Sequence, residues 1–190
     1  MMDEGKEFES IALPISPVIL QQEDFMENVS RVIRSYHIPA GKLAIEIDEY
    51  ALHTATLDLM VLMQELAAMG VELILNNFGS GYSGITQALE LPADTLKFDR
   101  MFTWQLETNP QSEPVIEGLS QIAVRMGKRL IAEGVETEKQ VEALNRFGCG
   151  LQQGFYYAPT VPELALSSII DATLEEAAGI LEQEREKLRR

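Results

Sequence analysis

The chain has 190 residues, with 30 acidic and 15 basic side chains and a formal net charge of −15. This length suits one domain, or one domain with an appendage, and the 46% hydrophobic content is ordinary for a folded protein, so disorder is not expected. The acidity argues against nucleic acid or an anionic membrane as the main partner, because neither would meet a basic patch. Cys149 stands alone, which excludes an intrachain disulfide framework. No apolar run approaches the length of a membrane span and the first residues have no apolar signal core, so we expect a cytoplasmic protein, or a cytoplasmic piece of a longer one, without membrane insertion.

Short β-favouring runs alternate with longer runs of helical periodicity, which predicts a mainly parallel α/β sheet or barrel. In chain order, we expect strands at 11–15, 43–47, 71–75, 95–98, 129–132 and 151–156, and helices at 24–36, 57–69, 83–89, 115–126 and 138–147. Gly70 stands where a helix should end, and Thr137 with Gln140 has the spacing of a capping box. The strands are fewer than the eight of a closed (β/α)₈ barrel. The fold class is therefore α/β, an incomplete TIM-like barrel.

The segment from Pro162 to Arg190 has no strand signal and differs from the rest of the chain. Apolar residues recur there in alternating steps of four and three, with Glu184 interrupting the series Ile170, Leu174, Ala177, Leu181 and Leu188. This spacing predicts a helix, which either docks on the barrel or frays, or else self-associates as a coiled coil. We therefore divide the chain into an N-terminal lead (1–10), a partial barrel (11–160) and a C-terminal helical tail (161–190).

Five ordered segments resemble motifs of the EAL domain, a TIM-barrel family that hydrolyses the bacterial second messenger cyclic di-GMP. They are similar to LxxEITE, DDFGTGYS, LPVDxLKIDR, AEGVET and GCxxxQGY, and stand in this sequence at 43–49, 76–83, 91–100, 132–137 and 148–155. The resemblance extends over roughly residues 11–159 and implies the family's barrel fold.

The resemblance also places the family's metal site, and here the sequence departs from the pattern. Glu46 matches a metal ligand, but Asn76 and Asn77 replace the two aspartates that bind and bridge the metals, and Pro14 replaces an asparagine ligand. No Glu-Ala-Leu-x-Arg precedes Ile11, so the first strand, with its glutamate and its ligand-holding arginine, is missing from this sequence. Mg²⁺ and Mn²⁺ are held mainly by carboxylates in such sites. We therefore expect no metal cofactor; Mg²⁺ or Mn²⁺ would be needed only if the protein were active.

Other family positions are retained. The resemblance implies a catalytic role for Lys97, a general-base role for Glu133 and a loop-bracing role for Glu136. It implies ligand-binding roles for Asp99, which helps to hold the second metal, and Gln153, which lies near the nucleotide. The structural alternative is that Lys97 forms an ion pair with Glu133 or Asp99 at the mouth of the barrel.

The remaining polar and aromatic singletons favour structural interpretations. His37 and His53 lack metal-ligand spacing and are expected at the surface, and Cys149 is expected to be a small buried residue rather than a nucleophile. Phe102 and Trp104 follow the strand at 95–98, where EAL domains have a dimerisation helix. They are predicted to pack in the core, with an interface anchor as the alternative.

Three functions remain open from the sequence. The favoured one is a catalytically inactive EAL-like domain that acts as a regulatory or protein-interaction module in bacterial cyclic di-GMP signalling, with a partner or a homodimer mate covering the open barrel edge. The alternatives are a cyclic di-GMP receptor that does not hydrolyse its ligand and an active metal-dependent phosphodiesterase. The missing first strand is either supplied by a partner, or the chain is a fragment of a longer sensor protein.

Overall fold

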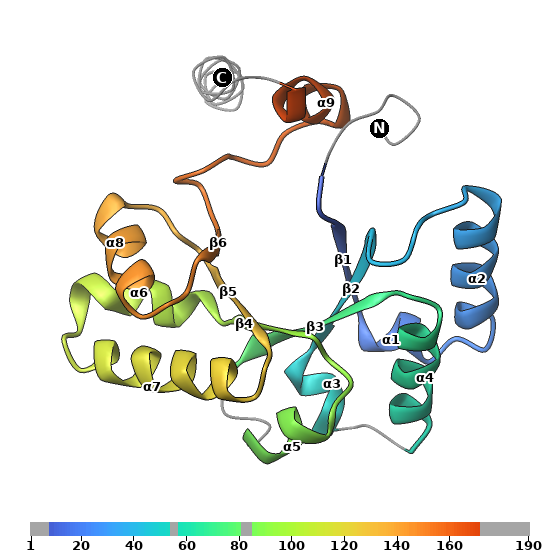
Figure 1. Ribbon diagram of the computed structural model, residues 1–190, viewed down its shortest axis with the longest axis horizontal. Helices are drawn as coiled ribbons and strands as arrows, with labels where there is room; N and C mark the ends of the chain where they lie inside the picture. The colour runs from blue at the N-terminus through green and yellow to red at the C-terminus, as the bar shows by residue number, and fades with distance from the viewer. Residues whose placement is uncertain (1–7, 54–56, 81–84, 172–190) are drawn as a thin grey trace.

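The computed structural model describes residues 8–53, 57–80 and 85–171 (Figure 1). Within them, one parallel sheet runs in the order β1 (Ile11–Ile15), β2 (Leu43–Asp48), β3 (Glu72–Phe78), β4 (Thr95–Phe98), β5 (Arg129–Glu133) and β6 (Leu151–Gln153). Figure 1 shows the sheet curled into a half-barrel with helices around its outer side, and β1 and β6 standing at its two ends. The incomplete TIM-like barrel predicted from the sequence is confirmed.

The helices of the described residues follow the strands in the expected rhythm. They are α1 (Pro17–Leu20), α2 (Phe25–Ser35), α3 (Glu49–His53), α4 (Leu57–Ala68), α5 (Ile85–Glu90), α6 (Arg100–Thr108), α7 (Ser112–Arg125), α8 (Glu138–Arg146) and α9 (Glu163–Asp171). Periodicity did not predict α1, α3 or α6; helices of four or five residues, such as α1 and α3, are too short to show it. The capping box predicted for α8 is present, with the Thr137 hydroxyl and the Gln140 side chain each accepting a backbone N–H.

The C-terminal tail is described only in part. Its first turns form α9, so the expected helix is confirmed there, whereas the choice between docking and coiled coil falls on residues 172–190, outside the described residues. No helix among the described residues is long and apolar enough to cross a membrane.

The convex side of the sheet and the helices form the apolar core. Ile45 and Ile47 on β2 are almost fully buried, as are Leu96 and Phe98 on β4. Phe98 stacks on Phe78 with ring centroids 6.5 Å apart, which links β4 to β3. The buried apolar residues of β2 and β4 occupy alternate positions, so they lie on the face of the sheet that the helices cover.

The concave side of the sheet carries charged side chains, which alternate with the core residues along each strand. Near the amino ends of the strands, the Arg129 guanidinium lies 2.9 Å from the Glu72 carboxylate and donates to the Thr95 hydroxyl. Nearer the carboxyl ends, Lys97 forms an ion pair with Glu46. Functional sites of parallel α/β barrels lie at the carboxyl ends of the strands, so the candidate site is sought around Lys97 and Glu46.

Two predicted strand ends are wrong. The third strand was expected to stop at Leu75, but β3 continues to Phe78, so Asn76 and Asn77 lie within it. Asn77 has φ of 57°, a left-handed conformation that asparagine tolerates, and the pairing of β3 with β4 shifts register at this point. The last strand ends at Gln153 rather than Tyr156. Beyond it, Gly154 packs against the backbone of Val135, an approach that only a residue without a side chain allows.

Candidate functional site

The centre of the site is a buried ion-pair cluster of Lys97, Glu46 and Glu133. The Lys97 ammonium lies 3.0 Å and 3.1 Å from the two carboxylate oxygens of Glu46 and 3.5 Å from Glu133 Oε2. The side chains of Lys97 and Glu46 are 4% and 9% exposed, and that of Glu133 is 31% exposed. The three residues come from β4, β2 and β5, so the cluster reaches across the concave face of the sheet.

Beside this cluster, the two asparagines of β3 have different surroundings. The Asn77 side-chain amide donates to Asp48 Oδ2 at 2.6 Å, and Asp48 in turn accepts from the backbone N–H of Tyr50 at the start of α3. The side-chain carbonyl oxygen of Asn76 is buried and has no hydrogen-bond partner. An amide oxygen of this kind can accept a hydrogen bond or coordinate a cation.

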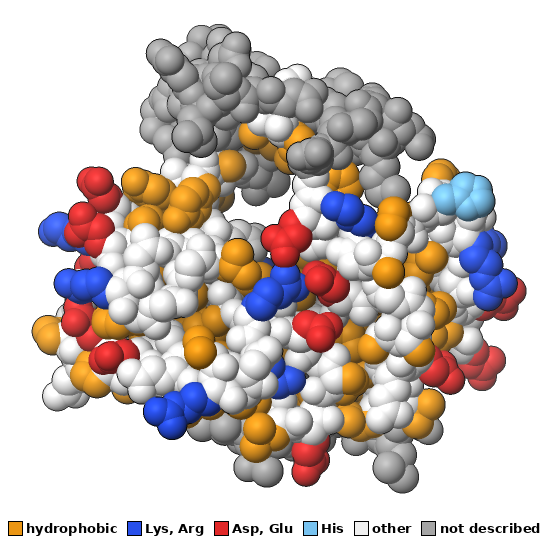
Figure 2. Space-filling model, in the orientation of Figure 1, with side chains coloured by type: hydrophobic (Ala, Val, Ile, Leu, Met, Phe, Trp, Pro, Cys, Tyr) orange, Lys and Arg blue, Asp and Glu red, His pale blue; other side chains and the backbone are white. Residues whose placement is uncertain are grey.

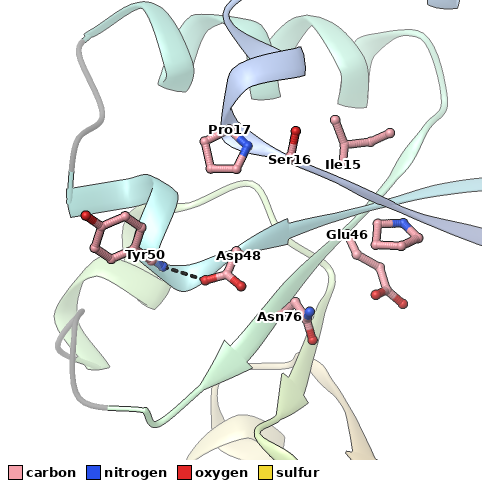
Figure 3. Close-up of a pocket in the computed structure, with 8 residues that line it drawn as sticks. Ile15, Ser16, Pro17, Glu46, Asp48, Tyr50 and Asn76 are labelled. Atoms are coloured by element: carbon pink, nitrogen blue, oxygen red, sulfur yellow. Dashed lines mark hydrogen bonds between the residues drawn. The ribbon is translucent and has the colours of Figure 1, made fainter.

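A cavity of about 430 Å³ opens over the carboxyl ends of β1, β2 and β3. Its lining is formed by Pro14, Ile15, Ser16, Pro17, Glu46, Asp48, Tyr50 and Asn76. Figure 3 shows Asp48 and Asn76 close together, with Ser16 and Pro17 coming from the end of β1. The Glu46 carboxylate in this lining is paired with the Lys97 ammonium, so the negative character that disfavours anionic ligands comes mainly from Asp48.

The other residues predicted from the sequence lie around this centre. Asp99 is the N-cap of α6, and its side chain accepts from the backbone N–H of Met101 at 2.8 Å. Gln153 pairs with Glu133 in the register of β5 and β6, and its side chain is exposed. The Glu136 side chain is also exposed. Pro14 lies opposite Glu46 in the register of β1 and β2. Glu46, Lys97 and Glu133 are thus brought into direct contact, whereas Asp99, Glu136 and Gln153 stay at the rim.

These residues do not fit a divalent metal centre. Both oxygens of Glu46 accept hydrogen bonds from Lys97, the Asp99 carboxylate caps α6, and Pro14 has no side-chain donor atom. The unpartnered oxygen of Asn76 is a neutral ligand and gives little charge compensation to a dehydrated dication. Among the described residues, no three His, Cys, Asp or Glu side chains are grouped so as to hold a metal ion.

The isolated histidine, cysteine and aromatic residues lie largely where the sequence predicts. His37 is exposed, and Cys149 is fully buried, where desolvation raises the pKa of its thiol to about 12. The His53 side chain lies outside what the structure describes. Phe102 packs against the core as predicted, but Trp104 is 42% exposed and stacks with the Arg100 guanidinium. The core assignment of Trp104 is therefore wrong.

Two acidic partners in the site were missed by the sequence analysis. Asp48 holds Asn77, and the fully buried Glu49 accepts from the Ser80 hydroxyl at 3.2 Å. Both follow the strand that carries Glu46, in the segment similar to LxxEITE. A signal was present, since acidic residues at the carboxyl end of a barrel strand lie where functional groups gather.

The comparisons with known proteins agree with this fold. The EAL domain model matches residues 1–160. The cyclic di-GMP phosphodiesterase RocR of Pseudomonas aeruginosa is 32% identical over 154 residues, which are 81% of this chain and 39% of RocR. The chain thus spans well under half the length of this relative.

Solved structures give the same result. The EAL domain of Mycobacterium smegmatis DcpA has a TM-score of 0.80 at 31% identity, over 85% of this chain and 72% of that one. The PaMucR phosphodiesterase in its c-di-GMP complex has a TM-score of 0.78 at 29% identity, over 83% of this chain and 64% of that one. With its alternating elements, its motifs and its half-barrel, this chain belongs to the EAL domain family.

Proposed function

We propose that this EAL domain does not hydrolyse cyclic di-GMP and instead acts as a regulatory or protein-interaction module in bacterial cyclic di-GMP signalling. The observation that carries the proposal is the contact of Lys97 with both oxygens of Glu46. The ammonium of Lys97 thus engages Glu46, the retained carboxylate among the family's metal ligands. Asn76 and Asn77 supply neutral amides at positions where binding of two metals needs negative charges. Two-metal hydrolysis requires cations that activate water and neutralise the phosphate, and this set of ligands gives them no adequate cage.

The open sheet supports the interaction role. Among the described residues, β1 has no strand on its outer side, and its Ile11 and Leu13 side chains are 40% and 46% exposed. Figure 2 also shows hydrophobic side chains gathered over the segment that follows β6, where Phe155 is 60% exposed. Unpaired strand edges with apolar side chains favour association. We propose that a protein partner, in the simplest case a second copy of this chain, covers the open edge of the barrel unit at 11–160, with 161–190 as a separate tail.

Hydrolysis is tested by incubating the protein with cyclic di-GMP and either Mg²⁺ or Mn²⁺, followed by chromatography of the nucleotide. The dinucleotide should remain intact, while an active phosphodiesterase of the family, assayed in parallel, should give linear product. Asn76→Asp combined with Asn77→Asp should also leave it intact, because Pro14 still occupies the position of an asparagine ligand and Lys97 still engages Glu46. Linear product from the unaltered protein would refute the proposal.

The second candidate is a receptor that binds cyclic di-GMP without hydrolysis. It is favoured by the cavity at the carboxyl ends of β1–β3 and by the c-di-GMP complex of the related PaMucR phosphodiesterase. The carboxylate of Asp48 weighs against it, since the ligand is a dianion. Calorimetric titration separates the two candidates: saturable heat with intact ligand indicates a receptor, whereas no heat together with concentration-dependent association in sedimentation supports the interaction module.

A further inference from the structure

An apolar groove lies on the convex side of the half-barrel, between β1 and α2. It encloses about 470 Å³, and its walls include Ile11 and Leu13 of β1 and Val29 and Val32 of α2. Lys42 is the single ionisable residue in this lining, all of which belongs to the described part of the chain. Ile11 and Leu13 are 40% and 46% exposed, and Val32 is 39% exposed. A contiguous apolar surface of this kind indicates a binding site for another segment or protein.

We propose that this groove binds the C-terminal tail of the same molecule, residues 172–190, as an amphipathic helix. The described chain ends with α9 at Asp171, and Figure 1 shows α9 on the open side of the half-barrel, between β6 and β1. Nineteen residues follow Asp171, and as a helix they extend about 28 Å, close to the diameter of a small domain. The tail is therefore long enough to reach from α9 to the groove beside β1.

The apolar pattern of the tail fits the groove in length. Leu174, Ala177 and Leu181 recur at steps of three and four residues, so in a helix they form one stripe. From Leu174 to Leu181 this stripe covers about 11 Å, at a rise of 1.5 Å per residue. The strand wall from Ile11 to Ile15 covers about 13 Å, at a rise of 3.3 Å per residue. A single helix of the tail can therefore cover the exposed side chains of β1.

Charge gives the tail a direction in the groove. Residues 22–27, which lead into α2 and begin it, carry three acidic and no basic side chains, whereas residues 28–42 carry three basic and no acidic ones. The tail has the same order, with four glutamates and no basic residue in 172–184, and four basic residues and one glutamate in 185–190. Laid antiparallel to α2, the tail places its acidic part beside the basic end of α2 and its basic part beside the acidic start. Acidic residues first and basic residues last also stabilise a helix through its dipole.

The contacts of Lys42 mark the end of the groove at which an antiparallel tail enters. Lys42 follows α2, donates to the Phe8 carbonyl oxygen, and places its ammonium 5.1 Å from the centre of the Phe8 ring. The carboxyl end of α2 and the beginning of β1 thus lie at the same end of the groove. There, Lys42 and Arg34, which stands in the last turn of α2, supply the basic charge that Glu175 and Glu176 meet.

The docking does not depend on the proposed function, but one consequence of it does. Ile11 and Leu13 belong to the β1 edge at which we propose that a partner binds. A docked tail covers these side chains, so its release makes the edge available. This consequence, that the tail regulates the interaction site, rests on the proposed function.

The experiment is limited proteolysis of the full chain with a glutamate-specific protease, which cleaves after Glu175, Glu176 and Glu182 in the tail. Mass spectrometry of the intact protein follows the loss of the C-terminal fragment. Leu181→Asn in the tail and Val32→Asn in the groove should each accelerate this cleavage by about tenfold. Each removes an apolar contact that holds the tail in the groove, and cleavage reports the population of the open form.

The matched control is Val124→Asn on α7, a valine that is 63% exposed but does not line the groove. Its tail should be cleaved at the rate found for the unaltered protein. Leu13→Asn is a second groove variant, placed on β1, and should act like Val32→Asn. Far-ultraviolet circular dichroism checks that each variant compared is folded.

The inference is overturned if the unaltered protein loses its tail as fast as Leu181→Asn, or if the folded groove variants are cleaved no faster than Val124→Asn. Protection that rises with protein concentration would place the tail of a second copy in the groove and would also overturn docking within one molecule.

Sedimentation of Leu181→Asn tests the regulatory consequence, because release of the tail should shift the protein toward association through the β1 edge. If this variant releases its tail and stays monomeric, the docking stands and self-association at that edge is refuted. Hydrolysis of cyclic di-GMP by the unaltered protein would refute the proposed function and leave the docking intact.

Discussion

The contact between Asn77 and Asp48 gives a direct test of how this site depends on its amides. The Asn77 amide nitrogen lies 2.6 Å from Asp48 Oδ2, and both residues are half-buried. Asn77→Asp replaces this donor by a second carboxylate. The backbone should tolerate the change, because aspartate, like asparagine, adopts the left-handed conformation found at this position.

The magnitude follows from Coulomb's law. Two unit charges about 4 Å apart repel by about 4 kcal/mol at an effective dielectric constant of about 20. Rotation of the side chains and partial access of water reduce this, whereas loss of the hydrogen bond adds to it. We expect Asn77→Asp to lower the free energy of unfolding by about 2–3 kcal/mol at pH 8, or roughly 5–10 °C in the midpoint.

The pH dependence has a defined sign. In the folded variant, repulsion favours proton uptake by one of the two carboxyls, so the folded state binds more protons than the unfolded state at mildly acidic pH. The loss in free energy of unfolding, relative to the unaltered protein, should therefore be largest at pH 8. It should shrink as the pH falls toward about 4, the ordinary value for aspartate.

The assay is urea unfolding in EDTA at pH 8 and pH 5, which prevents adventitious metals from relieving the repulsion. Asp48→Asn is the matched partner. Combined with Asn77→Asp it restores one amide beside one carboxylate, and stability should return to within about 1 kcal/mol of the unaltered protein. The electrostatic explanation would be contradicted if Asn77→Asp left the free energy of unfolding at pH 8 unchanged. It would also be contradicted if the double variant were no more stable than the single one.

Other parts of the fold give further expected outcomes. Because burial raises the pKa of the Cys149 thiol to about 12, it should resist a thiol reagent at pH 8 in the folded protein and react after unfolding in urea; rapid reaction in the absence of denaturant would contradict its burial. Gly154→Ala should cost about 3 kcal/mol or more in urea unfolding, because a methyl group there would collide with the Val135 backbone. Gly118→Ala, on α7 with open space around it, should be neutral or stabilising by up to about 1 kcal/mol; equal effects of these two alanines would count against the close approach. Thr137→Ala should cost about 1 kcal/mol by removing the cap of α8, and Thr137→Ser should retain most of that stability.

Much of the architecture could be predicted from the sequence alone. Apolar runs such as Leu43–Ile47 and the helical spacing that follows them are local signals, and local signals are sufficient to order the strands and helices of a parallel α/β fold. The sequence also identifies the motif around Glu46 and the asparagines at 76 and 77, where the EAL motif has aspartates, because each of these residues occupies a fixed place within a short segment.

The tertiary structure decided which groups meet. Lys97 had several acidic candidates on neighbouring strand ends, and the sequence analysis considered Glu133 and Asp99; in the fold, Glu46 contacts it most closely, 51 residues away in sequence. The Asp99 side chain instead caps α6. Asn77, in a left-handed conformation within β3, donates a hydrogen bond to Asp48.

The physical reason for this division is the range of the interactions. Side-chain periodicity and capping preferences act over a few residues and can be identified directly from the sequence. Ion pairing on the concave face depends on the curl of the sheet and on the register of β2, β4 and β5, which are set by packing of the whole core. The sequence by itself therefore determined the incomplete TIM-like barrel and the EAL family, and only the tertiary structure brought the Lys97 ammonium onto the Glu46 carboxylate.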